Sequence, residues 1–170
     1  MGQALAQSLS RHGVRARVRQ ILEADDFDAE FTPSFPFFKE ETMSTNSGPG
    51  YSKSLNHRVE TRPAGVRVRV TFNGEIVADS RDAIRLEESG YPPVYYVPHH
   101  DVRMERFKRT EHTTYCPFKG HASYYSLSSG ERTEENAVWS YEKPYDEVGV
   151  IRERLAFYPG KVDRIETLPV

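Results

Sequence analysis

The sequence lacks residues and segments that several classes of protein require. Its 170 residues contain a single cysteine, which excludes an internal disulfide and an all-cysteine zinc site. No apolar run approaches the roughly 20 residues that a membrane-spanning helix needs. The formal net charge of -2 provides no basic field for nucleic acid or for an anionic membrane surface. We therefore expect a soluble, cytoplasmic protein with neither a nucleic acid nor a membrane as its partner.

Motifs for phosphate and metal binding are also missing. Neither a Gly-x-Gly-x-x-Gly fingerprint nor a Walker-type lysine after a glycine loop occurs in the chain. The histidines do not have the tight, paired spacing of a zinc signature. We accordingly predict no metal and no cofactor.

The first fifty residues differ in character from the rest. Residues 1–22 contain arginines but no acid, and apolar residues recur at helical spacing within 14–24. The segment 44–50 is polar and rich in turn-forming residues, as a linker is. We predict an N-terminal extension over 1–49, partly helical or flexible, and a single domain over 50–170.

Three interpretations of the extension remain open. Its arginine-rich, acid-poor composition is typical of an organelle targeting segment. Alternatively, Met43 is the natural start and residues 1–42 precede the native protein. The third interpretation is an ordered arm, with Phe35, Phe37 and Phe38 packing on the domain or mediating self-association into a homo-oligomer.

From Val66 onward the sequence pattern predicts β-structure. Apolar and polar residues alternate over 66–72, and Asn73-Gly74 follows at once, the strongest short-range signal for a tight hairpin. Further strands are expected at 75–78, 84–87, 94–97, 121–127, 136–142, 155–158 and 162–165, with weak alternation at 102–107. Within this β region only residues 146–154, near the end, have a helical pattern. The predicted fold is mainly β and antiparallel, with one short C-terminal helix.

Five motifs in this region carry a resemblance to a known family. They are Val68–Ser80, Tyr95–Val102, Thr114–Gly120, Trp139–Pro144 and Ala156–Tyr158. In their sequence and order, they resemble the family catalogued as "domain of unknown function 427", over about residues 50–166. The resemblance implies a β-tent, in which two antiparallel sheets meet at a steep angle. This fold is similar in outline to methionine-R-sulfoxide reductases and to the thalidomide-binding domain of cereblon.

The resemblance does not imply a function for the protein. One catalogue label calls the family a nucleotidyltransferase domain, but nucleotidyl transfer needs carboxylates that hold a divalent metal. The matching motifs contain Asp79 and Asp101 without a paired-acid signature. Many β-tent relatives carry a four-cysteine zinc site, for which this chain has too few cysteines.

Thr113–Gly120 holds the cysteine and a lysine three residues later, and this stretch is the best candidate for part of a binding site. A lysine between an aromatic residue and a glycine suits a point contact to a carboxylate or phosphate, so we expect Lys119 to anchor a ligand. Aromatic runs on either side predict a pocket wall. The first hypothesis is therefore an aromatic-walled pocket for a small, anionic molecule. Its ligand-binding residues would be Lys119 for charge, Trp139 and Tyr141 for stacking, and Tyr96 and Asp101 for hydrogen bonds.

Two other functions remain open, and the sequence does not decide whether the protein is an enzyme. In the first, Cys116 is a catalytic nucleophile assisted by Lys119 or His121, because a neighbouring cation favours the thiolate. In the second, the chain is a non-catalytic interaction module.

Overall fold

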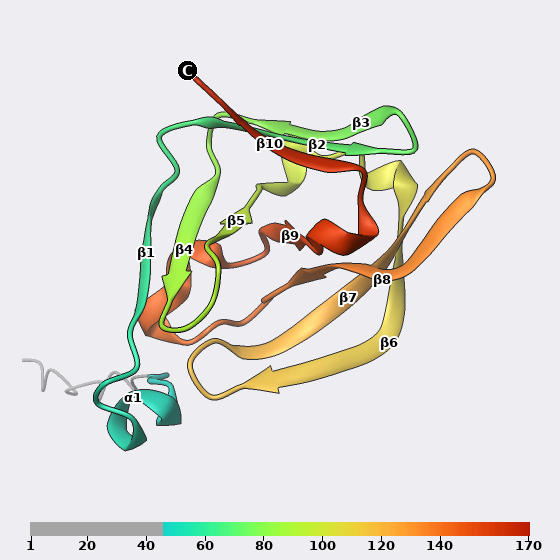
Figure 1. Cartoon of the computed structure of the whole chain (residues 1–170). Helices are drawn as coiled ribbons and strands as arrows, with labels where there is room; N and C mark the ends of the chain where they lie inside the picture. Colours follow the sequence, from blue (N-terminus) through green and yellow to red (C-terminus); the bar gives the residue numbers. More distant parts are fainter. Residues whose placement is uncertain (1–45) are drawn as a thin grey trace, which may run out of the picture. The chain divides into compact units, whose positions relative to one another are not determined.

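The computed structural model describes residues 46–170, and Figure 1 shows its elements in chain order. The helix expected at 14–24, the targeting interpretation and the phenylalanine-rich arm lie outside the described residues. The strands are β1 (Val59–Pro63), β2 (Arg67–Phe72), β3 (Glu75–Ser80), β4 (Ile84–Glu88), β5 (Val94–Tyr96), β6 (Phe107–Cys116), β7 (Gly120–Ser129), β8 (Arg132–Ser140), β9 (Leu155–Phe157) and β10 (Arg164–Leu168). The helices are α1 (Pro49–Lys53) and the short 3₁₀ segments η1 (His99–Asp101), η2 (Met104–Arg106), η3 (Asp146–Ile151) and η4 (Pro159–Lys161).

The strands form three antiparallel sheets. The first has the order β1-β4-β5, the second β10-β2-β3 and the third β6-β7-β8-β9. Figure 1 shows β2, β3 and β10 together at the top of the view, and β6, β7 and β8 together at the lower right. An isolated bridge joins the first and third sheets, because Val97 and Leu155 exchange two backbone hydrogen bonds of 2.8 Å.

The mainly-β, antiparallel prediction is confirmed. The turn between β2 and β3 has Asn73 at φ 49° and Gly74 at φ 75°, as a type I′ hairpin requires. The resemblance implied two sheets, whereas the described residues form three, of which the bridged pair meets at β5 and β9.

The C-terminal helical segment is η3, a 3₁₀ helix rather than an α-helix over the whole of 146–154. Val148 inside it has φ -122°, outside the helical region. Gly149 weakens helix propagation, and the burial of Val148 and Ile151 fixes the local backbone through tertiary packing.

Two hydrophobic clusters fill the interior. The alternation on β2 buries Val68, Val70 and Phe72, which pack with Leu127 and Leu155 in the larger cluster. The smaller cluster contains Ile84, Leu86, Tyr96, Tyr141, Val148 and Ile151. No helix within residues 46–170 has the length and apolar character needed to cross a membrane.

Asp79 on β3 forms ion pairs with two arginines of β2. Arg67 Nη2 lies 2.7 Å and Arg69 Nη2 lies 3.1 Å from Asp79 Oδ2. The hydrogen bond from Arg67, and then that from Arg69, lowers the pKa of Asp79 despite its partial burial. A carboxyl with a lowered folded-state pKa stabilises the fold above its unfolded pKa of about 3.9, and this contribution is lost as the pH falls through the folded value.

We therefore expect the free energy of unfolding to decrease below about pH 4, and the decrease to be smaller in Asp79→Asn. Urea unfolding of both proteins at neutral and acidic pH measures the difference. The same loss of stability in the two proteins would contradict a contribution from Asp79.

Candidate functional site

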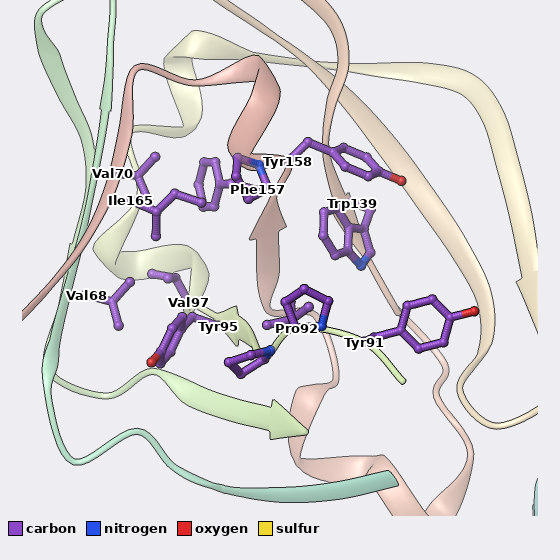
Figure 2. A pocket seen from close by; sticks show the side chains of 13 residues that line it. Val68, Val70, Tyr91, Pro92, Tyr95, Val97, Trp139, Phe157, Tyr158 and Ile165 are labelled. Atoms are coloured by element: carbon purple, nitrogen blue, oxygen red, sulfur yellow. The ribbon is translucent and has the colours of Figure 1, made fainter. Parts of the chain in front are cut away.

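An apolar cavity of about 450 Å³ lies between the second sheet and the strands β5, β8 and β9. In Figure 2, Val68, Val70 and Ile165 stand on one side of it, and Trp139 and Tyr158 stand on the opposite side. Val68 and Val70 face inward because every second side chain of β2 is buried, and side chains of β5 and β9 complete the wall. The cavity is suited to an apolar or aromatic group.

A second space of about 190 Å³, here called the tyrosine recess, adjoins this cavity. The two spaces share Tyr91, Pro92, Val94, Trp139 and Tyr158 as lining residues. The other residues of the recess are Leu86, Glu88, Tyr96, Lys119, Tyr124 and Tyr141. Its lining is more polar in character, with hydroxyl groups and two charged side chains.

The charged residues of the recess form an ion pair. Lys119 Nζ donates to Glu88 Oε2, and the two side chains are only 10% and 14% exposed. The other carboxylate oxygen, Glu88 Oε1, lies 3.0 Å from His57 Nε2. Glu88 is thus held between two basic side chains, one of which borders the recess.

The turn between β6 and β7 places Lys119. Gly120 has φ 97°, a conformation that favours glycine, and a Cβ there would lie 3.2 Å from the carbonyl oxygen of Lys143. The residues around α1 hold this turn: Gly50 N donates to Pro117 O at 2.9 Å. The His57 ring stacks on Phe118, with centroids 4.3 Å apart. Packing from outside the recess therefore fixes the lysine.

Two buried tyrosines, Tyr96 and Tyr141, line the recess together with the ion pair. Tyr96 Oη accepts a hydrogen bond of 3.3 Å from Trp139 Nε1, and its own proton donates to no other residue within 46–170. Tyr141 lies beside it, with ring centroids 6.4 Å apart, and its hydroxyl has no hydrogen-bond partner among residues 46–170. Burial raises the pKa of both phenols well above the usual value. Both are therefore protonated donors at neutral pH.

A chain of hydroxyl groups borders the recess on another side. Tyr124 Oη lies 2.9 Å from Thr114 Oγ1 and 3.4 Å from Tyr158 Oη. Burial, and then the hydrogen bond with Tyr124, raises the pKa of Tyr158 to about 12. The Tyr158 ring also packs on Trp139, with centroids 4.5 Å apart, so this chain orients the aromatic wall that both spaces share.

The structure brings four of the expected ligand-binding residues to the tyrosine recess: Tyr96, Lys119, Trp139 and Tyr141. The fifth, Asp101, lies in η1 and lines a separate surface depression with Arg67 and Asp79.

The expected catalytic residues are placed differently. Cys116 is half-buried against the smaller core cluster and lines neither space. His121 pairs with Tyr115 across the hairpin, while Cys116 pairs with Gly120. Because neighbouring residues of a strand face opposite sides, the thiol and the imidazole lie on opposite faces of the sheet. Lys119 serves the ion pair with Glu88.

Sequence reasoning missed Glu88, Tyr91, Tyr124 and Tyr158 as site residues. Glu88 had a usable signal, because the alternation that buries Ile84 and Leu86 places Glu88 on the same face of β4. A carboxylate on an apolar face requires a partner, and Lys119 supplies it. The part of the chain that the structure describes contains no cluster of three or more His, Cys, Asp or Glu side chains arranged to hold a metal ion.

Comparison with known proteins agrees with the motifs. A search of curated proteins finds no match. The model of one family, described as a domain of unknown function (DUF427), matches residues 60–167. This range contains every residue of the tyrosine recess and all of the apolar cavity. The chain belongs to the DUF427 family.

Proposed function

We propose that the protein binds a small molecule with an apolar body and an anionic group. The proposal rests on the shared wall of the two spaces, because an apolar cavity adjoins a recess lined by a lysine and by two phenols that donate to no other described residue. Ligand sites in proteins commonly combine an apolar lining with a few convergent polar groups.

The donors suit a carboxylate or a similar anion. Among the described residues, Lys119 Nζ donates only to Glu88, and an ammonium has three hydrogens to donate. The phenols of Tyr96 and Tyr141, which are protonated at neutral pH as phenols ordinarily are, supply further donors. An anion that accepts from these groups would be bound by charge and by direction together.

The apolar cavity supplies the remaining affinity. Each 100 Å² of apolar ligand surface removed from water stabilises the complex by about 2.5 kcal/mol. Trp139 offers an aromatic face to the ligand where the cavity and the recess meet, and Tyr158 supports it.

Trp139 is the only tryptophan of the chain, so its fluorescence reports directly on this site. We expect 3-phenylpropanoate to change the fluorescence saturably, and to bind about tenfold more tightly than the neutral 3-phenylpropanamide. Isothermal titration gives the two dissociation constants independently. Equal affinities for the acid and the amide would refute an anion site.

Two variants serve as controls for this titration. Asp101→Asn should leave the affinity unchanged, because Asp101 lies outside both spaces. Cys116→Ser should do the same, since the thiol lines neither. A loss of binding in Cys116→Ser would instead mean that the thiol contributes to the site.

A further inference from the structure

The ion pair at the tyrosine recess places one positive and one negative charge of the protein beside the expected ligand. From the Lys119–Glu88 pair we infer that the natural ligand is a zwitterion: its carboxylate binds Lys119, its ammonium binds Glu88 and its apolar side chain enters the apolar cavity. This is the chemistry of a free amino acid with a large apolar side chain. The inference rests on the proposed function and adds the cationic half of the ligand.

The net charge of the recess argues for a zwitterion. Lys119 and Glu88 are opposite charges, both of them 14% exposed or less, and they are the only charged side chains that line the recess within residues 46–170. A ligand that carried only an anion would gain from Lys119 but would leave a net negative charge beside the buried Glu88 carboxylate, so it should bind less tightly than a zwitterion. A ligand with both charges adds none.

The hydrogen-bonding groups of the pair also suit a zwitterion, because Lys119 can donate further hydrogen bonds and Glu88 can accept them. Counting bonds within residues 46–170, Lys119 has donors left after its bond to Glu88, and each oxygen of Glu88 accepts one hydrogen bond and retains a lone pair. A carboxylate and an ammonium placed beside this pair form a square of alternating charges, so the protein pair need not break. Each ligand charge then lies beside the opposite charge of the protein and beside the opposite charge of the ligand itself.

The surroundings of the pair accommodate an ammonium group as well. Six aromatic side chains line the recess: Tyr91, Tyr96, Tyr124, Trp139, Tyr141 and Tyr158. A cation close to aromatic faces is attracted by their quadrupoles. The recess volume of about 190 Å³ corresponds to roughly six water molecules, which is sufficient for the charged end of an amino acid while its side chain occupies the larger cavity.

Three compounds that share a phenyl group and a short aliphatic chain test the inference on the wild-type protein. Phenylalanine has both charges, 3-phenylpropanoate lacks the ammonium and 2-phenylethylamine lacks the carboxylate. We expect phenylalanine to bind at least about tenfold more tightly than either single-charge compound, by Trp139 fluorescence and by isothermal titration.

The Glu88→Gln variant provides the matched test. It keeps the size of the side chain and removes its charge, so phenylalanine should lose about tenfold in affinity while 3-phenylpropanoate gains. The ranking of the three compounds on the wild-type protein remains decisive if the variant fails to fold.

The outcomes separate the inference from the proposed function. If 3-phenylpropanoate binds the wild-type protein as tightly as phenylalanine, the zwitterion is wrong and the anion site stands. If 2-phenylethylamine binds most tightly, the inference is also wrong. If none of the three compounds changes the Trp139 signal, the proposed function fails together with the inference.

Discussion

Lys119→Met is expected to lower the free energy of unfolding by about 3 kcal/mol, because it leaves the Glu88 carboxylate buried without its ammonium partner. Removing one member of a buried pair costs more than the pair contributes, since the remaining charge stays desolvated. His57 remains within 3.0 Å of Glu88, which places the expected loss at the lower end of the usual range. Urea unfolding followed by circular dichroism measures it.

A second substitution separates the orphaned charge from lost packing. In the double variant Lys119→Met/Glu88→Gln no buried charge remains, so most of the lost stability should return. Lys143→Met changes an exposed lysine of the same neighbourhood and should alter stability by no more than about 0.5 kcal/mol. If the double variant is as unstable as Lys119→Met, the penalty comes from packing around the lysine stem and the electrostatic argument is wrong.

Local pattern predicted the strands whose side chains alternate between core and solvent. β2 buries every second residue, and the Asn73-Gly74 pair admits the positive φ angles that its hairpin needs, so pattern and turn chemistry agree there. β6 has no such signal. Its side chains are mostly exposed, and among the described strands it pairs only with β7, so its position depends on its partner and not on its own sequence.

The sequence predicted some residues of the candidate site and missed others. Tyr96, Lys119, Trp139 and Tyr141 belong to motifs that stand out by composition, and the fold places them around one recess. Asp101 belongs to a similar motif, but it lies in η1 and lines a separate surface depression. Glu88 lies 31 residues from its partner Lys119, and a contact over that separation depends on how the first and third sheets meet. Sequence spacing alone does not contain this information.

Leu155 lies where the first and third sheets are bridged. Leu155→Ala should lower the free energy of unfolding by about 3 kcal/mol. The side chain is fully buried in the larger core cluster, so truncation removes apolar burial and leaves a cavity. Its backbone also makes the bridge to Val97 that joins β5 to β9. The substitution should therefore weaken the packing around the bridge between β5 and β9, next to Val97 and Phe157, which line the apolar cavity.

Leu127→Ala is the matched control for this effect. Leu127 is as fully buried as Leu155 and belongs to the same cluster, but it lies on β7 and lines neither space. Both variants should lose a similar amount of stability in urea, while Leu155→Ala alone should weaken the binding of 3-phenylpropanoate, measured under conditions where both variants are folded. Equal affinities in the two variants would mean that the bridge does not control the geometry of the cavity. A loss of less than about 1 kcal/mol in Leu155→Ala would mean that the surrounding side chains collapse into the space that truncation leaves.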